Sequence, residues 1–268
     1  VDEICKALSS IDPAIDFIRV GSELPCDPKY RPYLLENMLS ACNRRSDVVE
    51  RISNCRVFVG TVATLSNKPE LFKLKTFDVA IIDEATQILE PQLLGLLSTW
   101  DVKGRNSIGK FILIGDHKQL PAVVLQQANQ TEIQDKLLRE AGIANLRDSL
   151  FERLYRTLNN FSDKGILDRA VDMLSRQGRM HPDVASFSNN TFYGGRLEPV
   201  GLPHQLETEE FPINISQGVR LTSRMVYIPS LPDHVNGSGK TNAFEALMVA
   251  ELAATIYNRN PEEFDVHN

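Results

Sequence analysis

The sequence predicts an α/β fold with helices on both faces of a parallel sheet. Two apolar runs, Phe77–Ile82 and Phe111–Ile114, show almost no alternation of polar and apolar residues. Such runs are typical of strands that are covered on both faces, as in a parallel sheet. The segment between them, Pro91–Trp100, has a helical pattern. Strand, helix and strand in this order indicate a doubly wound layer.

Further elements are expected before the first of these runs. They are a helix ending near Ser9, a strand at Phe17–Val20, a helix around Leu34–Leu39 and a strand at Arg56–Val59. Each expected strand is short and rich in β-branched or aromatic residues, which favours the extended conformation.

The pattern changes to long helical stretches from residue 126 to residue 173. We therefore expect a domain boundary near Asn145, which gives a first domain at 1–144 and the start of a second α/β domain at 145–268. The elements expected in the second domain are a helix at Val184–Asn190, a strand at Met225–Ile228 and a helix at Ala243–Tyr257.

The composition is that of an ordinary globular protein, with 42% hydrophobic and 24% charged residues among 268. A net charge of -6 argues against a uniformly basic nucleic-acid-binding protein, although one local groove can still be basic. No apolar run is long enough to cross a membrane, and nothing indicates an oligomer. None of the four cysteines forms a C-x-x-C pair. Their pattern indicates reduced thiols in a cytoplasmic protein.

Two acids, Asp83 and Glu84, follow directly after the first apolar run. Ligands of open parallel sheets bind at this carboxyl edge of the strands. An Asp there can hold Mg²⁺, mostly through water, and a Glu beside it can orient or deprotonate an attacking water. The alternative is that the acids merely cap the following helix.

A second polar segment, Gly115–Pro121, follows the next apolar run. Gly115 allows a sharp backbone turn. The amide of Gln119 can both donate and accept, so it could contact a γ-phosphate or the attacking water. Gln87 adds a second amide near the same edge. The alternative is a polar strand exit without a function, in which His117 is interpreted as a solvated loop residue.

A third segment, Arg176–Pro182, places Arg179 shortly before a helix that proline initiates. An arginine in this position can cross a domain interface and stabilise charge on a phosphoryl group in transfer. A salt bridge at the helix start is the alternative interpretation.

Together these segments resemble superfamily 1 helicases. DEATQ at 83–87, GDHKQLP at 115–121 and QGRMHP at 177–182 look like motifs II, III and IV. More specifically, the motifs resemble those of the 1B branch, which includes the nonsense-mediated-decay helicase and the DNA replication helicase–nucleases. Val59–Thr64 resembles motif Ic, and Ser149–Leu154 resembles the start of the second motor domain. The resemblance implies a partial RecA-like sheet of the P-loop NTPase type, then a helical segment and the start of a second RecA-like domain.

The resemblance also implies ATP and Mg²⁺ as cofactors and single-stranded nucleic acid, DNA rather than RNA, as the partner. It assigns catalytic roles to four residues. Asp83 would coordinate the metal and Glu84 would activate water. Gln119 would sense the γ-phosphate, and Arg179 would reach the γ-phosphate from the second domain. The nucleotide would also contact Gln87, Gly115, Asp116 and Gln177. Nucleic acid would contact Thr61, Thr64 and Pro121.

The implied function is ATP-driven 5′-to-3′ translocation and unwinding of DNA in replication or repair. A helicase-derived, non-catalytic nucleic-acid-binding module is the alternative.

The sequence departs from the family at two features that bind the nucleotide. The family's G-x-x-x-x-G-K-[ST] loop is missing and would lie before Val1. Gly237–Thr241 looks similar, but His234 stands where that loop needs its first glycine. In motif IV, Gly178 replaces a tyrosine that can stack on adenine. We therefore expect a central piece of a longer helicase that binds ATP weakly by itself.

Overall fold

In the computed structural model, two compact units can be described, Val1–Val171 and Asp172–Asn268. The structure describes residues 1–160, 165, 170–207, 213–214, 220–221, 224–230 and 241–259. Within these ranges no helix is both long and apolar enough to cross a membrane.

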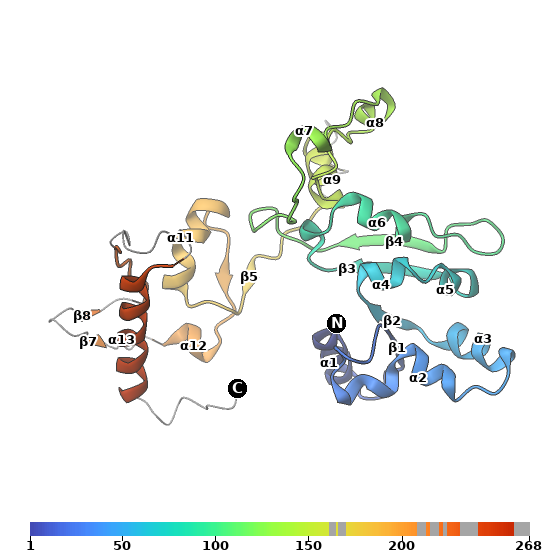
Figure 1. Cartoon of the computed structure of the whole chain (residues 1–268), viewed down its shortest axis with the longest axis horizontal. Coiled ribbons are helices and arrows are strands. Elements are labelled where there is room, and N and C mark those ends of the chain that lie inside the picture. The colour runs from blue at the N-terminus through green and yellow to red at the C-terminus, as the bar shows by residue number, and fades with distance from the viewer. Residues whose placement is uncertain are drawn as a thin grey trace. The chain divides into compact units, whose positions relative to one another are not determined.

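The first unit alternates short strands with short helices (Figure 1). Its elements up to the candidate site are α1 (Asp2–Ile11), β1 (Phe17–Val20), the 3-10 helix η1 (Pro28–Tyr33), α2 (Leu35–Ser40), α3 (Arg45–Asn54), β2 (Val57–Gly60), α4 (Val62–Ser66), α5 (Pro69–Leu74) and β3 (Phe77–Ile82). Those that follow are the 3-10 helix η2 (Ala85–Gln87), α6 (Glu90–Leu97), β4 (Ile108–Leu113), α7 (Ala128–Thr131), α8 (Lys136–Glu140) and α9 (Leu150–Asn159).

The four strands described in the first unit form two parallel pairs. β1 pairs with β2 from Phe17↔Val57 to Val20↔Gly60, and β3 pairs with β4 from Phe77↔Ile108 to Ile82↔Leu113. Parallel strands need long crossover connections, and helices supply them here. The predicted mixed α/β fold with short parallel strands is confirmed.

One buried cluster joins the two strand pairs into a single core. Its members come from β1, the helices between the strands, the end of α3 at Cys55, and β4: Ile18, Val20, Leu35, Ile52, Cys55, Leu71, Phe72, Leu96 and Ile108. A second cluster holds Ile82, Ala85, Leu93 and Leu150, directly behind the end of β3. The end of β3 is thus backed by packed apolar side chains, which fixes the residues that follow it.

The expectation that β3 is covered on both faces is wrong for the residues that the structure describes. Ile82 is buried, whereas Val79 and Ile81 are 40% and 66% exposed. On β4, Ile112 is exposed in the same way. Alternate side chains of a strand point to opposite faces, so one face of this pair packs on the core and the other is open. An unbroken apolar run does not distinguish a strand covered on both faces from one covered on a single face.

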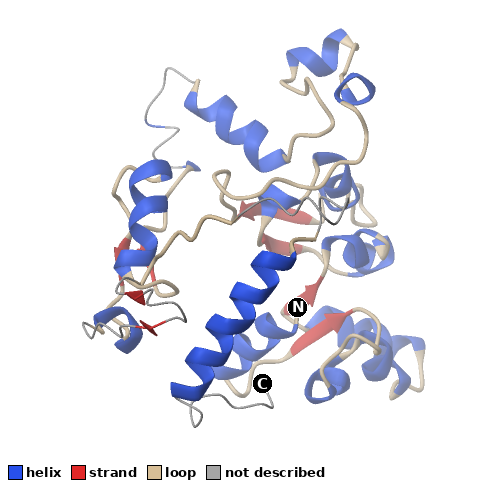
Figure 2. Cartoon of the chain, turned by 60° about the vertical axis from the view of Figure 1, so that its left-hand side comes forward, coloured by secondary structure: helices blue, strands red, loops and turns tan. Residues whose placement is uncertain are grey.

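The second unit contains smaller pieces of sheet among helices (Figure 2). Its elements are β5 (Arg176–Gln177), α11 (Pro182–Phe192), β6 (Glu198–Pro199), α12 (Pro203–Leu206), β7 (Ile213–Asn214), β8 (Arg220–Leu221) and α13 (Ala243–Arg259). β5 and β6 pair in parallel, and β7 and β8 pair antiparallel.

The strand expected at Met225–Ile228 is not formed, although these residues are described. Met225, Val226 and Tyr227 are 51%, 42% and 88% exposed. Among the described residues no strand pairs with this segment, and β propensity alone does not produce an extended ladder. The Gly/Ser-rich residues 237–240 lie outside the described residues.

Candidate active site

The two predicted acids lie at the carboxyl end of β3 and are exposed. Asp83 Oδ1 accepts a hydrogen bond from the Glu84 amide at 3.0 Å, and Gln87 Nε2 donates to Glu84 Oε2 at 3.2 Å. Glu84 has φ 52° and ψ 37°, and among the described residues it is the one non-glycine with positive φ. This left-handed conformation costs about 1–3 kcal/mol, and such strain clusters at functional sites.

The ends of β3 and β4 are joined by backbone hydrogen bonds beyond the ladder. The Ile114 amide donates to the Ile82 carbonyl, and the Ala85 amide donates to the Ile114 carbonyl, both at 2.8 Å. A Cβ on Gly115 would lie 3.0 Å from the backbone nitrogen and the Cγ2 of Thr86. Glycine therefore allows this close approach without displacing Thr86, and the approach brings the 83–87 turn against the start of the 115–121 segment.

The predicted phosphate sensor lies in a tight loop after β4. Gln119 Nε2 donates to Asp116 Oδ2 at 2.9 Å, and the Gln119 amide donates to the Asp116 carbonyl at 3.1 Å. The Lys118 amide donates to Asp116 Oδ1 at 2.9 Å. Gln119 and Pro121 are exposed. The Asp116 carboxylate thus organises the loop that carries the side-chain amide of Gln119.

His117 is not the solvated residue that its position in a polar loop indicates. Its ring lies 4.4 Å from the ring of Tyr155 on α9, tilted by 33°, and it is half-buried. Sequence reasoning missed this contact because 38 residues separate the two rings along the chain.

Two threonines occupy the start of α4, directly after β2. Thr61 Oγ1 accepts a hydrogen bond from the Thr64 amide at 3.1 Å, and the two hydroxyls lie 2.7 Å apart. This is an N-cap, in which the cap side chain satisfies one of the first amides of a helix. Thr61 and Asp83 both line a cavity of about 690 Å³ whose remaining walls are largely apolar. The structure therefore brings the threonine segment and the acid to one cavity.

In the second unit, the side chain of Gln177, a predicted nucleotide contact, hydrogen-bonds to the backbone of the residues that follow it. Its Oε1 accepts from the amides of Arg179 and Met180 at 3.0 and 2.8 Å, and its Nε2 donates to the Met180 carbonyl at 2.8 Å. This arrangement fixes the backbone that carries Arg179. The Arg179 side chain is exposed and forms no ion pair within the described part of the chain, so the alternative of a helix-start salt bridge gains no support.

Other side chains start the helix that follows Arg179. His181 Nδ1 accepts a hydrogen bond from the Asp183 amide at 3.2 Å, which caps α11. Sequence reasoning did not assign His181 this role.

The chemistry of the donors at the β3 end fits Mg²⁺. Asp83 and Glu84 supply carboxylate oxygens, the hard ligands that Mg²⁺ prefers. Within the described residues no three His, Cys, Asp or Glu side chains form a complete metal cage. Mg²⁺ keeps most of its ligands as water and substrate phosphate, so one or two carboxylates suffice.

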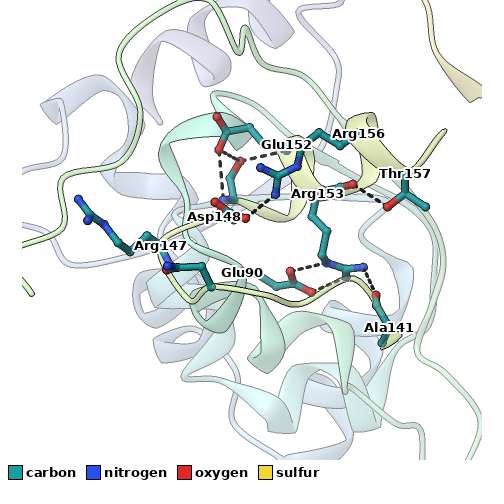
Figure 3. Close-up of polar contacts among 10 residues, drawn as sticks. Glu90, Ala141, Arg147, Asp148, Glu152, Arg153, Arg156 and Thr157 are labelled. Atoms are coloured by element: carbon teal, nitrogen blue, oxygen red, sulfur yellow. Dashed lines mark hydrogen bonds and ion pairs between the residues drawn. The ribbon is translucent and has the colours of Figure 1, made fainter. Parts of the chain in front are cut away.

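A partly buried ion pair connects α9 to α6 beside this site (Figure 3). Arg153 Nε and Nη2 donate to the two carboxylate oxygens of Glu90 at 2.7 and 2.5 Å, and the side chains are only 17% and 12% exposed. Hydrogen bonding to Glu90 raises the pKa of the Arg153 guanidinium above its ordinary value. Glu90 is the first residue of α6, so the pair connects the two helices that flank the acids.

Comparison with known families agrees with this geometry. A family model described as an AAA domain matches residues 35–127, and a second AAA-domain model matches residues 146–267. The first match includes Thr61, Asp83 and Gln119, and the second includes Arg179. The second match begins before α9, whereas the second compact unit begins at Asp172. The domain boundary near Asn145 stays a prediction.

Three helicases illustrate the relationship. The chain is 32% identical over 289 residues to the DNA replication ATP-dependent helicase/nuclease DNA2 of Bos taurus, which covers 99% of this chain and 24% of that protein. It is 31% identical over 185 residues to the DNA replication ATP-dependent helicase/nuclease JHS1 of Arabidopsis thaliana, covering 68% of this chain and 11% of the relative. An uncharacterized ATP-dependent helicase of Methanocaldococcus jannaschii is 31% identical over 159 residues, covering 58% and 19%.

The chain spans about a quarter or less of the length of these relatives. From the two AAA-domain matches, the parallel strand pairs and these relatives, the chain belongs to the superfamily 1 helicases and has a partial RecA-like fold.

Proposed function

We propose that this chain forms the hydrolytic part of an ATP-dependent DNA helicase. The observation that carries the proposal is the junction of β3 and β4. There, backbone hydrogen bonds from Ile114 to Ile82 and from Ala85 to Ile114, and the close approach of Gly115 to Thr86, bring together the segments that carry the two acids and residues 115–121. Hydrolysis of ATP needs a metal ligand, a group that positions water and a group near the γ-phosphate on one edge, and side chains that could take these three roles are carried by this junction.

The roles follow from the chemistry of each side chain. Asp83 would hold Mg²⁺, which when bound neutralises phosphate charge. The Glu84 carboxylate, fixed in a strained turn, accepts the proton of the attacking water or orients it. The Gln119 amide, held toward Asp116 before nucleotide binds, can turn to hydrogen-bond the γ-phosphate. Gln87 and Arg179 would contact the nucleotide from the two sequence segments that match AAA domains.

The same proposal includes a nucleic-acid strand. Thr61 and Thr64 place two hydroxyls together, and Thr61 lines a cavity that Asp83 also lines, so hydroxyl contacts to phosphate would lie near Asp83. Pro121 is exposed at the other end of the β4 loop. DNA rather than RNA is supported by the names of the bovine and Arabidopsis relatives. Movement in the 5′-to-3′ direction and a role in replication or repair belong to the proposal.

Replacing Asp83 by Asn tests this proposal against a non-catalytic module. In the full polypeptide, we expect ATP hydrolysis stimulated by single-stranded DNA and displacement of an annealed strand, and we expect D83N to lose both. Glu140→Gln is the matched control, because Glu140 is an exposed acid of the same unit whose ion pair in the described part of the chain is with the exposed Lys136.

A wild-type protein that binds single-stranded DNA but hydrolyses no ATP would favour the module instead. The 268 residues contain no G-x-x-x-x-G-K-[ST] loop to cradle the β- and γ-phosphates. The chain by itself is therefore expected to show no ATP hydrolysis above background, with or without DNA.

A further inference from the structure

We propose that Tyr155 of α9 is a positioning residue for Gln119. Through its ring contact with His117, it holds the 116–119 loop in the form that presents the Gln119 amide. This inference rests on the proposed function, since it assigns a support to the phosphate sensor of that site.

The first step is that α9 packs on the first compact unit, although it lies within the segment that matches the second AAA-domain model. Leu150 is 6% exposed and packs in the cluster behind the end of β3. Just before the helix, Ser149 forms an isolated antiparallel bridge with Leu89, and the Glu90 amide donates to the Asp148 carbonyl at 3.2 Å. The start of α9 is therefore fixed against the turn that follows the candidate acids.

The second step is that polar contacts fix the rotation of α9 about its axis. Besides its two hydrogen bonds to Glu90, Arg153 donates from Nη1 to the Ala141 carbonyl at 3.2 Å (Figure 3). Arg156 forms an ion pair with Asp148 next to the helix start. All three nitrogens of this planar guanidinium donate hydrogen bonds, so the helix that carries it can rotate little.

The third step is the ring contact itself. Tyr155 lies 4.4 Å from His117, and Phe151, one turn earlier on α9, stacks on Tyr155 at 6.3 Å with an interplanar angle of 9°. Residues four apart on a helix lie on the same face, so Phe151 supports the ring that faces the loop. His117 lies between Asp116 and Gln119, whose side chains bond to each other. A fixed helix thus holds the middle residue of the loop.

As a consequence, the packing of α9 controls the position of the side-chain amide of Gln119. Loss of the ring contact frees the loop, so the amide spends less time where it can meet a phosphate. Nucleotide binding depends on other groups as well, so the effect should fall on the rate of hydrolysis more than on the affinity for ATP.

Steady-state hydrolysis by the full polypeptide with single-stranded DNA tests this coupling. For Y155L we expect kcat to fall by about 2- to 10-fold, the factor that an aromatic pair can supply, with KM for ATP unchanged. Y155F keeps the ring and should retain the wild-type kcat. The double variant H117A/Y155L should be no slower than the worse single variant, because both changes remove one contact. Y227L is the matched control, since Tyr227 is 88% exposed in the second unit.

Amide hydrogen exchange provides a readout that does not depend on hydrolysis. The Lys118 and Gln119 amides are bonded to Asp116, so opening of the loop should raise their exchange rates by about 2- to 10-fold in Y155L and H117A, but not in Y155F or Y227L. The inference is overturned if exchange of these amides is unchanged in Y155L, or if the two substitutions reduce kcat additively. A wild type without hydrolysis would refute the proposed function, while the exchange result would still decide the loop contact.

Discussion

Removing the Glu90 carboxylate should destabilise the first unit much more than removing an exposed acid of the same unit. Glu90→Ala leaves the Arg153 guanidinium in a site where it is only 17% exposed, without either of its two carboxylate hydrogen bonds. Breaking a fully buried pair by removing one partner costs about 3–5 kcal/mol. Because both side chains keep some contact with solvent, we expect about 2–3 kcal/mol here.

The control is Glu140→Ala, whose partner Lys136 is 89% exposed and 3.7 Å away. Exposed pairs of this kind contribute about 0.2–1 kcal/mol. For a unit of this size, 2–3 kcal/mol corresponds to a loss of about 5–10 °C in melting temperature. Urea unfolding can be followed through Trp100, the single tryptophan of the chain, which lies in the first unit.

A loss in E90A that matches the loss in E140A would refute the view that this pair fastens α9. A further variant separates charge from packing. In E90L/R153M, two apolar side chains replace the pair, and we expect most of the lost stability to return because no uncompensated charge remains.

Three further substitutions test separate features. Glu84→Asn should raise the melting temperature of the first unit by about 2–4 °C while abolishing hydrolysis, because asparagine tolerates the left-handed conformation better than glutamate. Gly115→Ala should cost about 1–3 kcal/mol in urea unfolding, because its Cβ would press on the Thr86 backbone. Hydrogen bonding to Arg51 holds the pKa of Asp16 below its ordinary value, so the folded state binds fewer protons there than the unfolded state. That stabilisation is complete above about pH 4 and is lost as the pH falls further, so melting of Asp16→Asn should depend less on pH below about 4.

Each of these expectations has a contrary result. A lower melting temperature in E84N would mean that the left-handed turn carries no strain. Unchanged unfolding of G115A would mean that the strand ends can separate freely. An unaltered pH dependence in D16N would mean that the Asp16 carboxylate is not stabilised in the folded state.

The elements nearest the site were predictable because their signals are local. Phe77–Ile82 forms a strand with the predicted bounds, since a short apolar run followed by polar residues determines both the strand and its end. The acids after it and the Gly115 turn also follow from neighbouring residues. Ser149 and Glu152 form the capping box that starts α9, another local pattern.

Contacts between distant segments were not predictable in the same way. Glu90 and Arg153 are 63 residues apart, and the chain has many acids and arginines that could pair. The contact of His117 with Tyr155 likewise depends on where α9 packs. The left-handed conformation of Glu84 has no signal in residue type, because glutamate is not favoured there. The open face of β3 was missed because an apolar run does not show what covers it.

The most direct test of the hydrolytic site is a single-turnover comparison of Glu84→Gln with wild type in the full polypeptide. Glutamine keeps the size of the side chain and removes its ability to accept a proton. We expect the rate of ATP hydrolysis to fall by about 10²- to 10⁴-fold, as for loss of a general base, while the Kd for ATP stays within about twofold. A hydrolysis rate equal to that of wild type would contradict the assignment of the β3 acids as the hydrolytic end of the site.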